Sequence, residues 1–369
     1  MNHQRKKFKI LSVVGARPNF VKIMPIIQAS RKVGLKNILV HTGQHYDYRM
    51  SAIFFKDLNI PKPDVYLGAG SDSHARQTAK IMTAFESVLL KEKPSLVLVV
   101  GDVNSTIACA LTAVKLHIPV AHVEAGLRSF DMKMPEEVNR ILTDRISDYL
   151  FTPSTDANKN LLNEGIKRNK IFLVGNIMID TLLKFKSKAE LRKTYARFGL
   201  ENKKYVLLTM HRPENVDNKK YLVGIFAALK AISRKTPVVF PVHPRTGKNM
   251  SAFGLEKYIR NSKIALIKPI GYLDFLNLTI HARCVLTDSG GIQEETSVLK
   301  IPCLTLRENT ERPITVWKGT NIVVGTDKDA IVCQVNKILE GKIKKPGEIE
   351  LWDGNTAQRI IRIIKEAEY

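Results

Sequence analysis

The sequence predicts an α/β protein made of two Rossmann-like domains that face each other across a cleft, each built on a parallel sheet. Short apolar runs alternate with amphipathic stretches from residue 10 onward. The same alternation starts again near residue 205, after a basic segment that contains no strand-like run. The chain has 369 residues, more than one hydrophobic core usually serves, so two domains are favoured over one large doubly wound sheet.

Strands are expected at the short apolar runs, because such runs separated by helical patterns are typical of β-α-β units in a parallel sheet. In the first half they span 10–14, 38–40, 96–100 and 120–123, and helices are expected over 103–115 and 136–146. In the second half they span 205–209, 238–240, 264–267, 285–287, 304–306 and 322–324.

The change of domain is placed near Gly175-Asn176, ahead of the basic stretch 184–204. We therefore predict an N-terminal domain over 1–176 and a C-terminal domain over 177–352. A last segment, 353–369, is expected to be a helix that begins after the turn residues Asp353-Gly354-Asn355-Thr356.

The chain is strongly basic, with 58 Lys and Arg against 35 Asp and Glu and a net charge of +23. This charge fits either a protein that binds nucleic acid or a membrane surface, or a Lys-rich surface around a site for a small anion. The basic clusters at 5–7 and 342–345 lack interleaved aromatic residues, which stacking sites for nucleic acid usually have. A nucleic-acid partner is therefore not expected.

The spacing of the cysteines and the length of the apolar runs indicate in which cellular compartment the protein works. The four cysteines are scattered without a C-x-x-C pair, which favours reduced thiols over a disulfide framework or a zinc site. The longest apolar run, 96–100, is far shorter than the roughly 20 residues of a membrane helix. No signal peptide is recognised at the start of the chain. We predict a cytoplasmic protein without membrane insertion.

The loops that follow the predicted strands carry glycine beside charged or hydroxyl residues, and ligands of open parallel sheets bind at these strand ends. The most informative loop is Ser289-Gly290-Gly291, which opens a helix and offers free amide groups to a phosphate. Glu295, one turn into that helix, is placed to hold a ribose diol. An ordinary N-cap with Glu in the first turn is the equally weighted alternative. Neither G-x-G-x-x-G nor a Walker A run is present, so the phosphates are not expected to belong to NAD or ATP.

Asp102, Glu124 and Glu136 are three carboxylates in the first half, the first two at the ends of adjacent-looking strands. Carboxylates gathered in a cleft raise one another's pKa and so divide acid and base roles. The alternatives are metal binding for Asp102 and a helix cap for Glu136, and for Glu136 alone the cap is favoured. Arg17 and Lys22 flank the start of the first helix, where they suit an anion.

His211 ends a strand beside Arg212, a neighbour that disfavours the charged imidazole in a buried site. Catalytic and structural roles are equally weighted for it. His41 and His45 are four residues apart, but the strand and Gly43 between them argue against a helical metal pair. No H-E-x-x-H motif, nucleophile elbow or Cys/His cluster occurs.

In order along the chain, these loops resemble the non-hydrolysing UDP-N-acetylglucosamine 2-epimerases. The matching stretches are 15–18 with Lys22, 42–45, 101–102, 122–128, 135–140, 174–176, 211–215, 288–295 and 307–313. Two loops depart from the family's usual pattern, since Asn19 follows Pro18 where Glu is common and Pro213 stands where Arg is frequent. These departures concern the exact sugar more than the reaction.

The resemblance implies the glycosyltransferase-B architecture, a last helix that crosses back to the first domain, and a homodimer. It implies epimerisation at C2 of a UDP-sugar through elimination of UDP to a 2-acetamidoglucal and re-addition, with no NAD and no essential metal, for cell-surface polysaccharide biosynthesis. It assigns acid/base roles to Asp102, Glu124 and Glu136, and assistance to the departing diphosphate to His211. UDP contacts are expected from Arg17, Lys22, Ser289, Gly290, Gly291, Glu295 and Arg312, and a uracil pocket from the stretch with Ile270, Tyr272 and Phe275.

The resemblance also suggests a regulatory site, because the substrate activates many bacterial members of the family. Here Gln44 and His45 after the second strand, with Arg76, are the candidates; lining of the sugar pocket is the equally weighted alternative. Other functions considered are epimerisation of a related UDP-2-acetamido sugar such as a 2,3-diacetamido uronate, a hydrolysing epimerase, a glycosyltransferase of the same architecture, and a basic RNA-binding protein.

Overall fold

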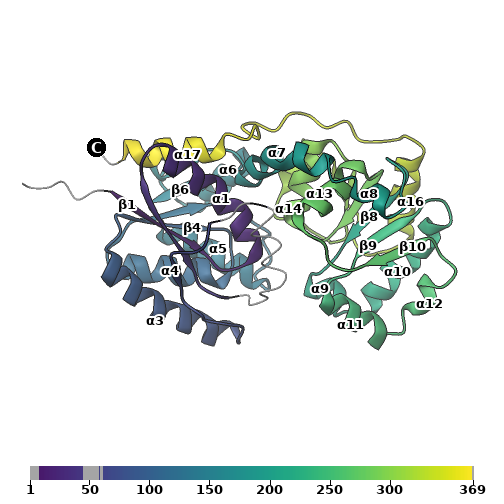
Figure 1. The fold of residues 1–369 in the computed structure, drawn as a ribbon, viewed down its shortest axis with the longest axis horizontal. Helices are drawn as coiled ribbons and strands as arrows, with labels where there is room; N and C mark the ends of the chain where they lie inside the picture. Colours follow the sequence, from purple (N-terminus) through teal and green to yellow (C-terminus); the bar gives the residue numbers. More distant parts are fainter. Residues whose placement is uncertain (1–7, 45–57, 59–60, 368–369) are drawn as a thin grey trace, which may run out of the picture. The chain divides into compact units, whose positions relative to one another are not determined.

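The computed structural model describes residues 8–44, 58 and 61–367. The chain divides into two compact units (Figure 1). Unit 1 comprises Met1–Thr181 and Glu350–Tyr369, and unit 2 comprises Leu182–Ile349. The division falls inside helix α7 (Ile177–Glu190), a few residues after the boundary that the sequence suggests.

Unit 1 is built on a seven-stranded sheet whose order is β3-β2-β1-β4-β5-β6-β7 and whose pairs are all parallel. The strands are β1 (Lys9–Val14), β2 (Lys36–His41), β3 (Val65–Tyr66), β4 (Leu96–Val100), β5 (Val120–Val123), β6 (Tyr149–Thr152) and β7 (Ile171–Leu173). Every residue of β4 and β5 is buried, as expected for central strands covered on both faces.

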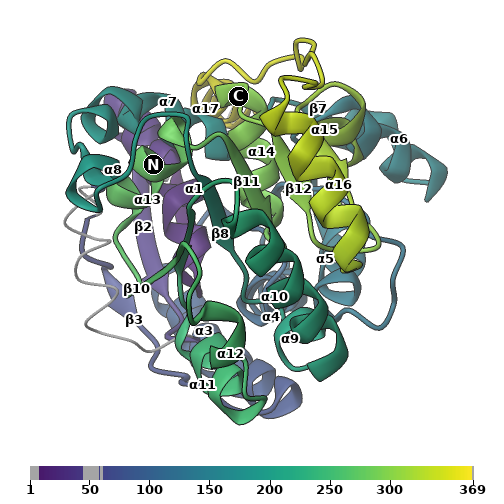
Figure 2. The same cartoon turned by 90° about the vertical axis from the view of Figure 1, so that its right-hand side faces the viewer.

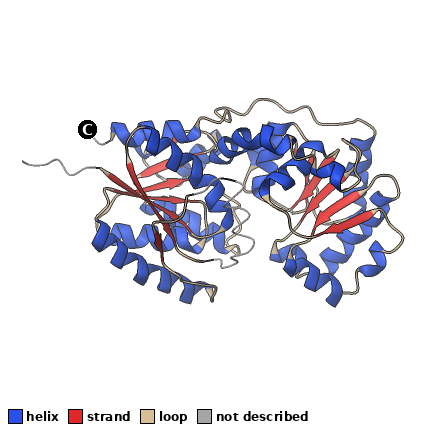
Figure 3. Cartoon of the chain, viewed as in Figure 1, coloured by secondary structure: helices blue, strands red, loops and turns tan. Residues whose placement is uncertain are grey.

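The helices of unit 1 cover both faces of this sheet (Figure 3). They are α1 (Arg17–Lys32), α3 (His74–Glu92), α4 (Asn104–Lys115), α5 (Pro135–Ile146), α6 (Thr155–Asn163), the start of α7 and α17 (Thr356–Glu366), with a 3-10 turn over Arg168–Lys170. Helix α4 packs between α3 and α5, whereas α17 packs against α1. The Asp180 carboxylate accepts hydrogen bonds from the Thr356 and Ala357 amides, 3.1 and 2.8 Å away, and so fixes the start of α17.

Unit 2 has a six-stranded parallel sheet in the order β10-β9-β8-β11-β12-β13. Its strands are β8 (Val206–Thr209), β9 (Val238–Pro241), β10 (Ile264–Ile267), β11 (Cys284–Thr287), β12 (Cys303–Thr305) and β13 (Asn321–Val323). Its helices, besides the end of α7, are α8 (Thr194–Arg197), α9 (Pro213–Val216), α10 (Lys219–Ser233), α11 (Pro244–Ala252), α12 (Glu256–Ile259), α13 (Tyr272–His281), α14 (Gly290–Leu299), α15 (Pro313–Trp317) and α16 (Lys328–Leu339).

Two apolar cores hold unit 2 together. Helices α10 and α16 lie side by side and bury one face of the sheet (Figure 2). Residues of α13 and α14 pack on the other face. From Tyr205, just before β8, the residues alternate between the cores, because successive side chains of a strand point to opposite faces. Val206 and Leu208 lie in the first core, and Tyr205 and Leu207 lie in the second.

The strands expected from the short apolar runs are confirmed, with ends that differ by up to two residues. The sequence reading missed β3, β6 and β7, which hold only two to four residues each. Within the described residues, no helix has both the length and the apolar character needed to cross a bilayer.

The chain reverses direction of winding between β1 and β4 in unit 1 and between β8 and β11 in unit 2. At such a switch point the loops leave the carboxyl ends of neighbouring strands toward opposite faces, which opens the usual ligand site of this fold. The loops that follow β4, β5, β8 and β11 carry Asp102, Glu124, His211 and Ser289 respectively.

Candidate active site

Lys22 and Glu124 form a buried ion pair at the switch point of unit 1. Lys22 lies on α1, one turn after its start, and its Nζ donates to Glu124 Oε2. The Glu124 residue is 5% exposed, and its Oε1 is buried without a hydrogen-bond partner among the described residues. A carboxylate paired with lysine, with one oxygen left without a partner among the described residues, is placed to exchange a proton with a ligand.

Asp102 follows β4 and lies beside Arg140 of α5, with 3.3 Å between Asp102 Oδ2 and Arg140 Nη2. The Asn139 side chain donates to the Asp102 carbonyl at 2.9 Å. Because β4 and β5 are neighbours in the sheet, the expectation that Asp102 and Glu124 end adjacent strands is confirmed.

Glu136 occupies the first turn of α5 after Pro135. Its side chain is half-buried and takes no hydrogen bond or ion pair from the residues that the structure describes. The neighbouring Glu137 behaves differently: it is fully buried and accepts hydrogen bonds from the Ser129 and Phe130 amides at 2.8–3.0 Å. Glu137 therefore shapes the loop before α5, and Glu136 is left available for other chemistry.

Of the three residues predicted for regulation, the structure describes Gln44 and Arg76. The Gln44 side chain is buried, and its Oε1 accepts hydrogen bonds from the Ser105 amide at 3.0 Å and the Ser105 hydroxyl at 2.6 Å. Arg76 is exposed in the first turn of α3, beside Gln77, whose amide donates to the Gln44 carbonyl at 3.3 Å. The start of α3 thus touches the loop after β2. His45 lies outside the described residues.

Arg17 begins α1, but its side chain lies outside the described part of the chain.

The Ser289-Gly290-Gly291 loop begins α14 in unit 2, with Ser289 as the N-cap. The first amides of a helix have no carbonyl partner within the helix and carry the positive end of its dipole. The Arg312 guanidinium packs directly against this turn, since a Cβ on Gly290 would lie only 2.3 Å from Arg312 Nη1. A side chain at position 290 would displace the Arg312 guanidinium from this turn, and helix and guanidinium together offer positive charge to an anion.

Arg312 belongs to a cluster of guanidinium groups arranged around one buried carboxylate. Glu311 accepts from Arg307 Nη1 at 2.9 Å on each oxygen, from Arg212 Nη2 at 3.2 Å and from Arg312 Nη1 at 3.4 Å. Arg312 Nε also donates to Glu294 at 2.7 Å. These contacts fix the arginines in place for charge-assisted binding of an anion.

Glu295 is fully buried on α14, with Oε1 accepting from the Tyr272 hydroxyl at 2.8 Å. Its Oε2 has no hydrogen-bond partner among the described residues. Burial raises the pKa of Glu295 to about 7, with a further rise from Glu294 and an opposing effect of the Tyr272 hydrogen bond. Burial and the Glu295 charge also raise the pKa of Tyr272.

The three residues predicted for a uracil pocket lie just before α13 and in its first turn. Ile270 and Phe275 are partly buried against the core that α13 and α14 share with the sheet. Tyr272 begins α13 and joins this apolar group to Glu295 through its hydroxyl. An apolar patch next to a buried carboxylate suits a nucleoside, whose base is flat and whose ribose carries hydroxyl groups.

His211 follows β8 and has an exposed side chain. Its Nδ1 lies 3.4 Å from Oδ1 of Asp288, a buried carboxylate that also accepts from the His211 and Arg212 amides at 3.0 and 2.9 Å. The Arg212 guanidinium pairs with Glu311, and the carboxylate of Asp288 faces His211.

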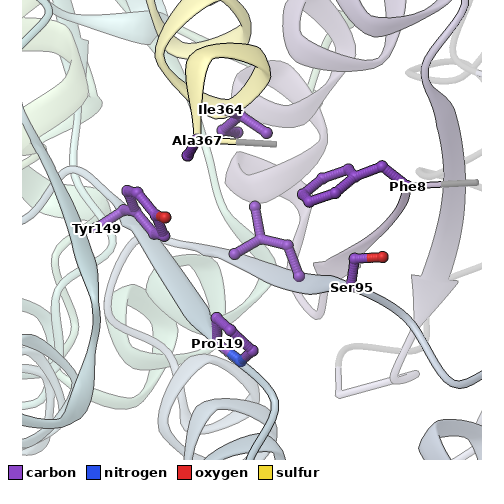
Figure 4. A pocket seen from close by; sticks show the side chains of 7 residues that line it. Phe8, Ser95, Pro119, Tyr149, Ile364 and Ala367 are labelled. Carbon is purple, nitrogen blue, oxygen red and sulfur yellow. The ribbon is translucent and has the colours of Figure 1, made fainter. Parts of the chain in front are cut away.

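One small hollow lies away from these residues (Figure 4). Its volume is about 120 Å³, and it is lined by Phe8, Ser95, Leu96, Pro119, Tyr149, Ile364 and Ala367. These residues stand at the amino ends of β1, β4, β5 and β6 and on α17, whereas ligands of this fold bind at the carboxyl ends. None of the predicted site residues lines it.

Arg140 and Asp144 are among the polar residues at the site to which the sequence assigned no role. Arg140 touches Asp102, and its position four residues after Glu136 on a helix was an available signal. Asp144 is fully buried and joins His122 to Arg128. The feature of the sequence that could have pointed to Asp144 is its position one turn after Arg140, on the same face of α5.

The family model described as UDP-N-acetylglucosamine 2-epimerase matches residues 28–365. The chain belongs to this family. A UDP-N-acetylglucosamine 2-epimerase of Methanocaldococcus jannaschii is 46% identical over 98% of this chain and all of the relative. A UDP-2,3-diacetamido-2,3-dideoxy-D-glucuronate 2-epimerase of Pseudomonas aeruginosa is 44% identical over 92% of this chain and 95% of the relative.

Solved structures of epimerases agree with the fold. The M. jannaschii UDP-GlcNAc 2-epimerase in complex with UDP-GlcNAc and UDP has a TM-score of 0.89 over 97% of this chain and all of that chain. A glycosyltransferase of Rickettsia africae, 13% identical, matches with a TM-score of 0.53 over 98% of this chain and 93% of that chain. That likeness concerns the fold alone, and the predicted architecture of glycosyltransferase-B type is confirmed.

Proposed function

We propose that this enzyme interconverts UDP-N-acetylglucosamine and UDP-N-acetylmannosamine without hydrolysing either. The observation that carries the proposal is the buried Lys22–Glu124 pair beside Asp102, in a chain that belongs to the 2-epimerase family over nearly its whole length. A glycosyltransferase needs no such set of acid/base carboxylates.

The reaction begins with removal of the C2 proton by a carboxylate. The C2–H electron pair forms the C1=C2 bond while the C1–O bond breaks, and UDP leaves with that bonding pair. The 2-acetamidoglucal is then protonated at C2 on its opposite face, and the UDP oxygen adds back to C1. Asp102, Glu124 and Glu136 supply the acid and base, since each step moves one proton between C2 and a carboxyl group.

The α14 N-terminus and Arg312 hold the diphosphate. His211 assists its departure as the leaving group. Positive groups aimed at the leaving oxygen lower the barrier because negative charge develops there. Glu295 holds the ribose, and the apolar residues Ile270 and Phe275 hold the uracil. Arg17 adds a further cation for the phosphates.

Regulation by the substrate is part of the proposal. A second UDP-N-acetylglucosamine would bind at the loop after β2, where Gln44 and Arg76 lie near one another through Gln77. Such binding activates the enzyme if the ligand prefers the catalytically competent conformation. The rate would then depend sigmoidally on substrate concentration.

We further propose that the enzyme works as a homodimer in the cytoplasm, with no nucleic-acid partner and no NAD or essential metal, and supplies cell-surface polysaccharide synthesis. Cys109, Cys284 and Cys303 are buried free thiols, which suits a reducing compartment. Light scattering with size-exclusion chromatography tests the dimer, and a mass equal to one chain contradicts it.

Incubation with UDP-N-acetylglucosamine in D₂O tests the reaction. Deuterium should appear at C2 of both epimers, without added NAD or metal and with no net release of UDP. Label absent from C2, or activity lost on treatment with a chelator, contradicts the proposal. Parallel incubation with the UDP-2,3-diacetamido uronate distinguishes the related substrate, on which the enzyme should be much slower.

A further inference from the structure

A buried hydrogen-bonded cluster lies beneath the carboxylates of unit 1, and none of the steps above uses it. His122, on β5, is 0% exposed. Its Nδ1 lies 2.6 Å from Asp144 Oδ1, and its Nε2 lies 2.8 Å from the Gly101 carbonyl oxygen. Both partners accept hydrogen bonds when Asp144 is ionised, and each ring nitrogen lies within hydrogen-bond distance of one of them.

The charge state of Asp144 agrees with this arrangement. Burial pushes the pKa of Asp144 upward, but His122 and Arg128 outweigh burial and leave the pKa below its ordinary value. Arg128 Nη1 lies 2.7 Å from Asp144 Oδ2, and the same guanidinium donates to both oxygens of Glu164 at 2.7 Å. The cluster is therefore ionic and fully enclosed at His122 and Asp144.

The cluster connects the two loops that carry the proposed catalytic carboxylates. Gly101, whose carbonyl accepts from His122, immediately precedes Asp102. Asp144 Oδ2 also accepts from the Gly126 amide at 3.0 Å, two residues after Glu124. One imidazole thus contacts the Asp102 loop directly and the Glu124 loop through a single carboxylate.

The backbone of both loops needs such support. Gly101, Glu124 and Gly126 all have positive φ, at 73°, 72° and 80°. For Glu124 this left-handed conformation is unfavourable, and it persists only where surrounding contacts enforce it. A Cβ on Gly101 would lie 3.4 Å from Lys22 Nζ and 3.7 Å from Glu124 Oε2, so a shift of this peptide would disturb the ion pair.

We propose that His122 is a positioning residue. Its two hydrogen bonds, to Gly101 and to Asp144, fix the Asp102 and Glu124 loops relative to each other, so that both carboxylates are aligned for proton transfer at C2. This role rests on the proposed epimerase function. A misplacement of about 1 Å can cost about 10²-fold in rate, so removing both bonds should lower kcat strongly.

Three substitutions separate the two bonds. His122→Gln places an amide near Nε2 and keeps the bond to Gly101, whereas His122→Asn places one near Nδ1 and keeps the bond to Asp144. His122→Phe keeps the ring shape and removes both. Val97→Ala, a buried change on β4 in the same sheet at a residue that makes no side-chain hydrogen bond, is the matched control for lost stability.

The expected result is a loss of kcat of about 10²-fold for His122→Phe, with smaller losses for the Gln and Asn variants. KM and the UDP dissociation constant should stay within about threefold, because UDP is held by unit 2. The misaligned enzyme should also release more 2-acetamidoglucal and UDP per turnover. A merely structural role would instead make kcat follow the melting temperature, as in the control.

Folding of unit 1 is checked independently by Trp352, which is buried and donates to the Pro153 carbonyl at 2.8 Å. Its fluorescence should be unchanged in a folded variant. In His122→Phe, hydrogen exchange in the 124–128 segment should accelerate at least about tenfold, because Asp144 no longer holds the Gly126 amide firmly. This measurement needs no turnover.

The positioning role is overturned by a kcat of a folded His122→Phe variant within about threefold of wild type, or by unchanged exchange in the 124–128 segment. Losses of kcat that match those of a control with equal thermal destabilisation also overturn it. A wild-type enzyme that fails to epimerise UDP-N-acetylglucosamine refutes the proposed function instead, and the exchange measurement then still decides whether His122 orders the loop.

Discussion

Glu295 should make the stability of the protein depend on pH in an unusual direction. Its pKa is raised by burial to about 7 in the folded protein, against an ordinary value of 4.5. A carboxyl group with a raised folded pKa keeps its proton longer in the folded state than in the unfolded state. The free energy of unfolding therefore falls as pH rises from about 4.5 to about 7, and this contribution is level above that range.

The size of the effect follows from the two pKa values. Their difference corresponds to about 3 kcal/mol in total, of which about 2.5 kcal/mol is lost between pH 5 and pH 8. Glu295→Gln removes the ionisation, so the free energy of unfolding of the variant relative to wild type should rise by this amount over the same range. Two unsatisfied amide hydrogens reduce the absolute stability of the variant but not this pH dependence.

Urea unfolding followed by circular dichroism at pH 5, 6, 7 and 8 measures the difference. Glu256→Gln is the matched control, since it makes the same substitution at an exposed site of unit 2 and should leave the pH dependence unchanged. Parallel stability curves for wild type and Glu295→Gln across this range would refute the reasoning, because Glu295 would then ionise at the same pH in the folded and unfolded states.

The remaining predictions concern turnover. Asp102→Asn, Glu124→Gln and Glu136→Gln should each lower kcat by about 10²–10⁴-fold, the usual loss for acid/base groups, with the UDP dissociation constant from calorimetry little changed. A variant with near-normal kcat excludes that residue from proton transfer. Gln44→Ala and Arg76→Ala should flatten a sigmoidal rate curve more than they lower the maximal rate. Hyperbolic kinetics of the wild type in both directions, with no lag from UDP-N-acetylmannosamine alone, would count against regulation at that site.

The strands and the loops that follow them were predictable from the sequence because they depend on local pattern. Runs such as 96–100 are buried on both faces and therefore apolar throughout, which a sequence displays directly. Strand β3 was not predictable this way, because two residues give too little periodicity. Strands β6 and β7 hold four and three residues, as many as the predicted strands β5 and β12, so the same apolar signal was available for them.

Helix α5 shows why part of the site was missed. Amphipathic helices usually bury their apolar stripe, but the buried residues of α5 include Glu137, Arg140 and Asp144, whereas Leu142 is 49% exposed. The spacing of the three charged residues, three and then four, places them on one side of the helix. A prediction based on hydrophobicity places that side of the helix in solvent. The charged residues are buried instead, because they pair with residues on β5 and in the loops after β4 and β5.

Those partners come together through strand order, which spacing along the chain does not reveal. His211 and Asp288 are far apart in the sequence, yet their strands β8 and β11 are neighbours at the switch point of unit 2. Asp102 and Glu124 are brought together in the same way by β4 and β5. Once this order is known, a buried carboxylate such as Asp288 or Asp144 has an evident task, since it binds the amides of one strand-end loop from a neighbouring element. Burying a charge is costly unless it is paired, so such a residue is retained where the loop geometry it fixes is needed for function.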